Sequence, residues 1–254
     1  MQIVGYRTAA AEEGPALVFA VEGRVRTRSL APGTELEYGL GERRCAGTVD
    51  GTGHDPCEAP TAPYCPAHVG RWACARCTGD CDLPLDTCRE EHAVYLAAFA
   101  PATFKVGVTR SWRLETRLRE QGADRAAHLR TVENGRTARQ IEAEIADDVG
   151  DSVRVRSKIE GLHRSVDETA WSGLLDRYEH VETDAFEYGF DLSSRPVPET
   201  VAHGTVRGTK GRVLVLDAAG STYAVDMREL VGYEVDRDGD PSDRRLQSSL
   251  GAFR

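Results

Sequence analysis

The cysteines are the feature that most limits how this chain can fold. All seven lie between residues 45 and 88, and four of them fall within the fifteen residues CARCTGDCDLPLDTC that end at Cys88. A histidine, His68, lies in the same region. A Cys-x-x-Cys spacing lets a tight turn direct two sulfurs at one ion, and a structural zinc site takes four nitrogen or sulfur ligands. Seven cysteines and one histidine therefore divide into two sets of four.

Two structural zinc ions are the interpretation that the spacing favours. The first set is Cys45, Cys57, Cys65 and His68, and the second set is Cys74, Cys77, Cys81 and Cys88. Three alternatives stay open: a single zinc with spare buried cysteines, His54 in place of His68, or a redox role for the CARC segment. His92 is a candidate for a further ligand, a catalytic base or a core residue. Because a closed four-ligand site has no open coordination position, we expect these ions to hold the fold together and not to catalyse.

The location of the protein bears on this choice. The first twenty residues alternate in a strand-like pattern and contain acids, with no basic run followed by an apolar block, and no later stretch approaches the length of an apolar membrane span. We therefore expect a cytoplasmic protein with no membrane partner. Cytoplasmic thiols stay reduced, so clustered cysteines favour metal binding over disulfides.

The net charge of −9 does not by itself exclude a nucleic-acid partner. Lysine occurs only at Lys105, Lys158 and Lys210, the other 29 of the 32 basic residues are arginine, and acidic residues total 41. This composition is typical of halophilic adaptation, in which a hydrated acidic surface keeps proteins soluble. An acidic total normally argues against phosphate binding. In this chain the acidic total reflects adaptation to high salt, so only local clusters of basic residues indicate which partners the protein binds.

The pattern along the chain predicts an α+β fold. Residues 1–44 and 195–235 carry short alternating runs typical of antiparallel β segments, and residues 45–91 are the Cys-rich zinc-binding region. Residues 92–183 predict a central α/β domain with an extra helix, and residues 236–254 a mobile tail. Each β segment has too few strands to be stable alone, so we expect the two to pair into one small barrel.

Within the central domain the predicted order is strand, strand, helix, strand, helix. HAVYLAAF and FKVGVT predict a hairpin, and HLRTVE a third strand. A helix is expected over 111–122, ending at Gly122, and another over 137–150, where Thr137 and Gln140 fit a capping box. A further helix is expected over 167–181.

Residues 92–149 resemble the GIY-YIG endonuclease domain. The sequence AVY, ending at Tyr95, stands where that superfamily has its first signature, and KVG, ending at Gly107, where it has the second. Arg117 and Glu142 complete the pattern on the two helices that follow. The cysteine region followed by HAVYLA, KVGVTR, QGA and DETAW also resembles a family of prokaryotic proteins of unknown function.

The nuclease resemblance implies roles for three residues. Tyr95 would orient the scissile phosphate or accept a proton, and Arg117 would stabilise the charge that develops on the phosphate in the transition state. Glu142 would bind Mg²⁺ or Mn²⁺, which polarises phosphoryl oxygens. Independently of the resemblance, Glu142 falls at the border of the apolar stripe of its helix, from where a carboxylate can point into a cleft.

The sequence departs from the nuclease pattern at Lys105, which occupies the position of the second tyrosine. The spacing to Arg117 is also longer than usual, so Arg113 competes for the same role. Lys105, Arg110 and Arg113, with Arg117, form the strongest positive cluster in this acidic chain, and we assign them to nucleic-acid binding.

Three functions from different classes follow from these observations. The first is a metal-dependent endonuclease acting on DNA or RNA, with Tyr95, Arg117 and Glu142 as catalytic residues. The second is a non-catalytic nucleic-acid-binding module that uses the same groove. The third is a protein-interaction scaffold with no affinity for nucleic acid. Convergence of Tyr95, Arg117 and Glu142 on one cleft would favour the first two over the third. The sequence does not indicate an oligomeric state.

Overall fold

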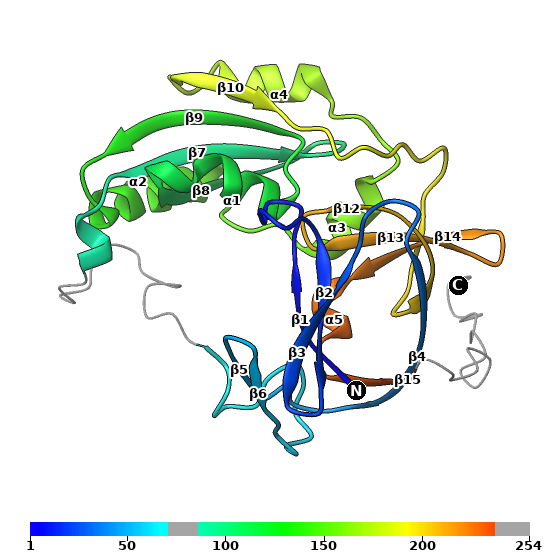
Figure 1. Cartoon of the computed structure of the whole chain (residues 1–254). Helices are drawn as coiled ribbons and strands as arrows, with labels where there is room; N and C mark the ends of the chain where they lie inside the picture. The colour runs from blue at the N-terminus through cyan, green and yellow to red at the C-terminus, as the bar shows by residue number, and fades with distance from the viewer. Residues whose placement is uncertain (71–85, 237–254) are drawn as a thin grey trace.

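The computed structural model describes residues 1–70 and 86–236. These residues form two β sheets of unequal size, one with eleven strands and one with four, and most of the helices lie beside the smaller sheet (Figure 1). The predicted α+β class is confirmed. None of the helices in the described part of the chain combines the length and the apolar character that crossing a bilayer requires.

The larger sheet combines the two ends of the chain. Its strand order is β11-β14-β13-β12-β4-β15-β1-β2-β3-β6-β5. Strand β4 pairs with β12 on one side and β15 on the other, and β15 also pairs with β1. The expected pairing of the two flanking segments is therefore confirmed. The strands are β1 (Gln2–Arg7), β2 (Ala16–Val21), β3 (Arg24–Ser29), β4 (Glu35–Arg43), β5 (Thr48–Asp50), β6 (Gly53–Asp55), β11 (Val197–Pro198), β12 (Ala202–Lys210), β13 (Val213–Ala218), β14 (Ser221–Asp226) and β15 (Tyr233–Asp236).

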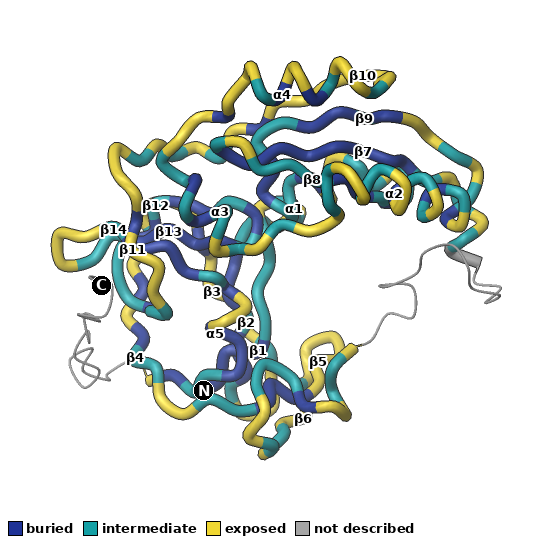
Figure 2. The backbone as a smooth tube through the Cα atoms, turned by 180° about the vertical axis from the view of Figure 1, so that it is seen from behind, coloured by how far each residue is buried: buried dark blue, intermediate teal, exposed yellow. Residues whose placement is uncertain are grey.

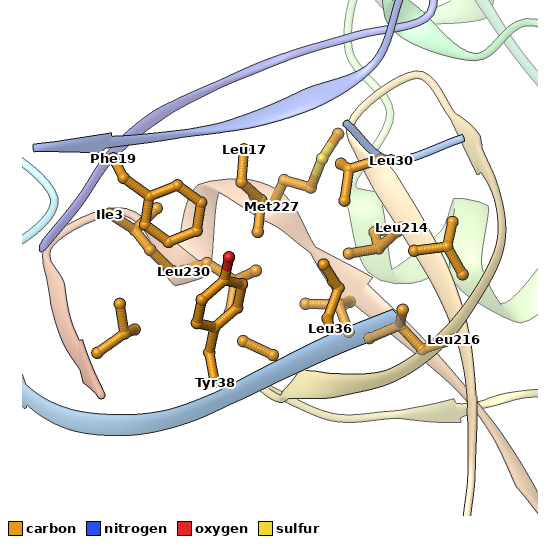
Figure 3. Packing of buried hydrophobic residues seen from close by; sticks show 14 residues of the cluster. Ile3, Leu17, Phe19, Leu30, Leu36, Tyr38, Leu214, Leu216, Met227 and Leu230 are labelled. Carbon is orange, nitrogen blue, oxygen red and sulfur yellow. The ribbon is translucent and has the colours of Figure 1, made fainter. Parts of the chain in front are cut away.

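The larger sheet curls around a single apolar core. Phe19 on β2, Tyr38 on β4 and Leu216 on β13 belong to one buried cluster, although they lie on strands from opposite ends of the chain. Figure 3 shows these side chains pointing toward one another, with Met227 and Leu230 from the short helix α5 (Met227–Leu230) among them. Neither end of the chain can bury this apolar surface alone, which is why the pairing of the flanks is required for folding.

The smaller sheet is antiparallel and has the order β10-β9-β7-β8. Its strands are β7 (His92–Phe99), β8 (Thr103–Arg110), β9 (Arg125–Val132) and β10 (Glu182–Ala185). Strand β7 lies between β8 and β9, and every residue after His92 in this strand is buried (Figure 2). A central strand that is covered on both faces has a nearly continuous apolar sequence, and HAVYLAAF is such a sequence.

Helices cover both faces of this sheet. Val94 and Leu96 of β7 pack with Ala138 of α2 (Gly135–Val149) and Trp171 of α4 (Glu168–Leu175). The alternate residues of β7 pack with α1 (Leu114–Gln121). The order β7, β8, α1, β9, α2 is the predicted one. A helix that the sequence analysis did not predict, α3 (Val155–Gly161), follows α2.

Helix ends differ in part from the prediction. Gly122 ends α1 in the left-handed conformation as expected, but residues 111–113 form a separate 3-10 turn before α1. The predicted capping box at Thr137 is wrong, because Asn134 caps α2 and its side chain accepts a hydrogen bond from the Thr137 backbone N–H at 2.9 Å. The cap lies earlier because Asn134 precedes a glycine and an arginine that also adopt helical geometry. Helix α4 ends at Leu175, before the expected residue 181.

The two sheets meet where α1 ends against the turn between β12 and β13. Gly122 and Gly211 both have positive φ angles, of 72° and 55°. A Cβ atom on Gly211 would lie 2.7 Å from the Gly122 backbone nitrogen. Next to this contact, Lys210 Nζ forms a 2.5 Å ion pair with Asp124 Oδ1, and both side chains are largely buried. The two glycines thus allow two backbones to touch where a buried charge pair joins the sheets.

We predict that Gly211→Ala destabilises the protein by about 3 kcal/mol or more, because alanine would combine an unfavourable φ with a clash against fixed backbone atoms. Gly220→Ala is the matched control, since Gly220 has a φ of 77° but no atom within 4 Å of an added Cβ. The control should lose only about 1–2 kcal/mol for its left-handed backbone. Urea unfolding measures both values, and equal losses would contradict the proposed role of the Gly122–Gly211 contact.

Candidate functional site

Four side chains from the Cys-rich region form a cluster that can hold a metal ion. The Sγ atoms of Cys45, Cys57 and Cys65 and a ring nitrogen of His68 all lie within 4.8 Å of one another. The Nδ1 atom of His68 is 3.4 Å from Cys45 Sγ and 3.3 Å from Cys65 Sγ, and the Sγ atoms of Cys57 and Cys65 are 4.0 Å apart. Tetrahedral zinc with ordinary bond lengths needs edges of about 3.5–3.8 Å. The cluster therefore fits the first ligand set predicted from the sequence.

The fold positions these ligands through the end of β4. The carbonyl oxygen of Cys45 accepts a hydrogen bond from Gln2 Nε2 at 3.2 Å, and the same nitrogen donates to the carbonyl of Gly232 at 3.0 Å. The Cys45 sulfur accepts from the backbone N–H groups of Gly47 and Cys65. Such N–H donors stabilise a thiolate, which is the form that binds a metal ion.

The surroundings of Cys65 favour its thiolate, which is the form that binds a metal ion. Burial raises the pKa of Cys65, but hydrogen bonds from the Ala67 backbone, from Cys45 and from His68 outweigh burial and lower the pKa to about 7. A thiol with this pKa is deprotonated in part at neutral pH, where an ordinary thiol is not. Binding of a cation at Cys65 therefore displaces a proton with little cost near neutral pH.

The structure decides between the two histidines that were candidates for the fourth ligand of this cluster. His54 Nε2 is 2.8 Å from the carbonyl oxygen of Ala46 and takes no place in the cluster, whereas His68 does. His54 lies in the short β5–β6 hairpin beside the cluster, so its ring supports the ligand loop.

Most of the second predicted ligand set lies outside the described residues. Cys74, Cys77 and Cys81 cannot be placed, and Cys88 lies in a 3-10 turn (Asp86–Arg89) next to β7. His92 Nδ1 lies 2.7 Å from the carbonyl oxygen of Glu90, and its ring packs at Gly135 with the backbone of Cys88 nearby. His92 therefore sits between this turn and α2.

Tyr95 is buried under α1 and reaches no open surface. It is only 1% exposed, and its ring lies over Gly107, where a Cβ atom would approach the ring Cζ and the hydroxyl to 2.6 Å. The hydroxyl accepts a hydrogen bond from Gln121 Nε2 at 2.5 Å. Burial raises the pKa of Tyr95, and the nearby Arg117 opposes this only in part. Tyr95 is therefore a neutral phenol at pH 7, suited to hydrogen bonding and not to accepting a proton.

Glu142 and Lys105 lie together at the edge of the sheet formed by β8. Burial lowers the pKa of Lys105, while the charge of Glu142 raises it and that of Arg117 lowers it. Glu142 also raises the pKa of Tyr95. The charges of Arg117 and Glu142 thus act on both Tyr95 and Lys105.

The environment of Glu142 does not fit a divalent cation. Its carboxylate is 8% exposed and accepts a hydrogen bond from Arg139 Nη1 at 2.6 Å. Lys105 adds a second positive charge nearby. Among the described residues, Cys45, Cys57, Cys65 and His68 are the only set of three or more His, Cys, Asp or Glu side chains that can share an ion. Because positive charge already neutralises Glu142, we derive no metal-dependent step through it.

The three predicted arginines lie between the end of β8 and the middle of α1, and each pairs with an acid. Arg110 is 3.5 Å from Glu90, and Arg113 is 2.8 Å from Glu120. Arg117 also contacts Glu120, at 3.2 Å, and 46% of its side chain is exposed. Lys105 differs from these arginines because it is largely buried, and burial lowers its pKa.

Sequence reasoning missed Trp112, which the structure leaves 69% exposed between two of these arginines. The guanidinium carbons of Arg110 and Arg113 lie 5.8 Å and 5.9 Å from the centre of the Trp112 ring. The signal in the sequence was the Arg-Ser-Trp-Arg run, in which an aromatic residue is flanked by cations. We call Arg110, Trp112 and Arg113 the Trp112 platform.

We predict that His68→Ala lowers the zinc content of the purified protein by one equivalent relative to wild type, because one of four ligands is lost. His54→Ala, the matched control in the same region, should keep the wild-type content. Elemental analysis after dialysis against a weak chelator measures both. Equal zinc loss in the two variants would contradict the assignment of His68.

Residues 64–235 match the family described as "Protein of unknown function (DUF2797)". A search of curated proteins and a search of solved structures each found no match. The matched segment includes Cys65, His68 and the whole smaller sheet, whereas Cys45 and Cys57 precede it. Because the match covers more than half of the chain, this chain belongs to the DUF2797 family of proteins of unknown function.

Proposed function

We propose that this protein binds single-stranded nucleic acid through the Trp112 platform and that it does so without metal-dependent cleavage. The observation that carries the proposal is the exposed indole of Trp112 between the guanidinium groups of Arg110 and Arg113. Aromatic faces stack on unpaired bases, and arginine contacts the adjacent phosphates. A duplex keeps its bases stacked inside, so this surface favours single strands.

The charge pattern around the platform supports this proposal. Glu90 and Glu120 hold Arg110 and Arg113 in ion pairs that are partly exposed. Such pairs are worth at most about 1 kcal/mol, so a phosphate can replace the carboxylates as the arginine partner. Glu90 Oε2 also accepts a hydrogen bond from Trp112 Nε1 at 3.2 Å, which orients the ring.

The frame beneath the platform supports a nuclease ancestry. In the sheet the strand order is β8-β7-β9, and along the chain α1 lies between β8 and β9 while α2 follows β9. This arrangement is compatible with the GIY-YIG resemblance. Tyr95 lies on β7, Arg117 on α1 and Glu142 on α2. In this proposal Tyr95 and Glu142 are structural, because one is sealed under Gln121 and the other is paired with Arg139. Arg117 remains available to an anion.

The proposal includes zinc as the ion of the Cys/His cluster, with a structural role. Three sulfurs and one imidazole nitrogen form a ligand set that zinc prefers over harder cations. We propose a second zinc at Cys74, Cys77, Cys81 and Cys88, which lies mostly outside the described residues. Cys88 and the first residue of β7 are near neighbours, so this ion would fix the start of the smaller sheet.

We predict that Trp112→Ala weakens binding to single-stranded oligonucleotides by about 5- to 150-fold, the loss expected for one base stacked on an aromatic ring. Fluorescence anisotropy with labelled single-stranded DNA and RNA measures the affinity. Val181→Ala, which removes another side chain that is 69% exposed, is the control and should bind as wild type does. Unchanged affinity of Trp112→Ala would reject the platform as the binding surface, whereas no binding by the wild type would favour an interaction scaffold.

We predict that neither the wild type nor Glu142→Gln cleaves DNA or RNA in the presence of Mg²⁺ or Mn²⁺, while both bind. Glu144→Gln on the exposed face of the same helix is the matched control. Gel analysis of labelled substrates after incubation measures cleavage. Cleavage by wild type and Glu144→Gln that is lost in Glu142→Gln would instead establish a metal-dependent phosphodiesterase with a cation at Glu142.

A further inference from the structure

A cavity of about 630 Å³ lies between the two sheets, beside the junction of Gly122 and Gly211. Its walls come from β1 and the loop that follows, from α1, from the start of α3, and from the β12–β13 turn. Six basic side chains line it: Arg7, Arg117, Arg154, Lys158, Lys210 and Arg212. Glu120 is the only acidic lining residue.

This concentration of positive charge is unexpected in a chain with a net charge of −9. Carboxylates outside the lining pair with Arg7, Lys210 and Arg212. Arg154 and Lys158 have no carboxylate partner in the described part of the chain. The Nε atom of Arg212 is buried with no hydrogen-bond partner among the described residues. The cavity therefore presents donors that an anion would satisfy.

Two of the three lysines of the chain lie at this cavity. Lys158 and Lys210 line the cavity, and Lys105 is close enough to lower the pKa of Lys158. Lys158 Nζ donates to the carbonyl oxygen of Gln121 at 2.7 Å and lies 4.1 Å from the centre of the Phe99 ring. Arginine supplies 29 of the 32 basic residues, so lysine is rare in this chain and enriched at the cavity. An ammonium group is a compact charge that fits a restricted space.

We propose that this cavity is a binding site for the phosphate groups of a nucleotide-sized ligand, distinct from the Trp112 platform. Cavities of about 300–1,000 Å³ hold ligands of this size. Arginine forks and lysine ammonium groups are the usual partners of phosphate oxygens. Val153, Val155 and Val213 form an apolar part of the wall on which a base or sugar can pack.

Proton uptake should accompany binding. Burial lowers the pKa of Lys158 most, and together with the charges of Lys105 on β8, Arg212 and Lys210 at the β12–β13 turn and Arg117 on α1 it brings this pKa to about 7. An anion among these cations favours the charged amine and raises this pKa. Because the bound state holds more protons than the free state above pH 7, affinity should fall as the pH rises from 7 to about 9.

The test is calorimetric titration of the full chain with ATP and with inorganic pyrophosphate. We expect both to bind, with Lys158→Met and Arg154→Gln each weakening the affinity about tenfold or more. Arg156→Gln is the matched control, because Arg156 lies on the same helix, is 81% exposed and does not line the cavity. Titration in buffers of different ionisation enthalpy should show proton uptake at pH 8 in wild type and none in Lys158→Met.

Oligonucleotides with and without a 5′-phosphate distinguish the source of the phosphate. Tighter binding of the phosphorylated strand, lost in Lys158→Met, assigns the cavity to a strand end, whereas binding of ATP alone assigns it to free nucleotides. Trp112→Ala should keep ATP binding, so the two proposals fail separately. The cavity proposal is overturned if ATP, pyrophosphate and the 5′-phosphate all fail to bind, or if Lys158→Met and Arg154→Gln bind as wild type. Arg154 is exposed, so its variant tests the site even if Lys158→Met does not fold.

Discussion

The buried ion pair between Lys210 and Asp124 is the interaction on which the arrangement of the two sheets depends. Asp124 directly precedes β9 and also accepts a hydrogen bond from the backbone N–H of Ala100, the residue after β7, at 2.9 Å, so one carboxylate joins the ends of β7, β9 and β12. Removing one member of such a pair leaves an uncompensated buried charge, at a cost of about 3–5 kcal/mol. The cavity beside the pair exists because Gly122 and Gly211 let the backbones meet there.

A second constraint ties the metal cluster to the larger sheet. Gln2 in β1 is buried and bonds the carbonyls of Cys45 and Gly232, which lie far apart along the chain. The ligand loop is therefore anchored to the same sheet that forms one wall of the cavity. A metal ion that closes the loop would stabilise this sheet through the N-terminal flank, because binding energy at such a site is also folding energy.

In the region that resembles a nuclease, burial and neighbouring charges decide what Tyr95 and Glu142 can do chemically. Tyr95 is sealed against Gly107, and Glu142 is paired with Arg139. Lys105 adds positive charge where the superfamily has a tyrosine. Positive charge around a single carboxylate disfavours a cation and favours an anion.

The sequence by itself determined the α+β class, the element order of the smaller sheet and the ligand set of the described metal cluster, because alternation, caps and cysteine spacing are local signals. It assigned His68 but kept His54 as an alternative, missed helix α3 and placed the cap of α2 too late. Only the tertiary structure decided that Trp112 is exposed, that Tyr95 is buried and that Lys158 and Lys210 line one cavity. Burial and convergence depend on contacts between segments that are distant in the chain, such as β12 and α1, and no local pattern records them.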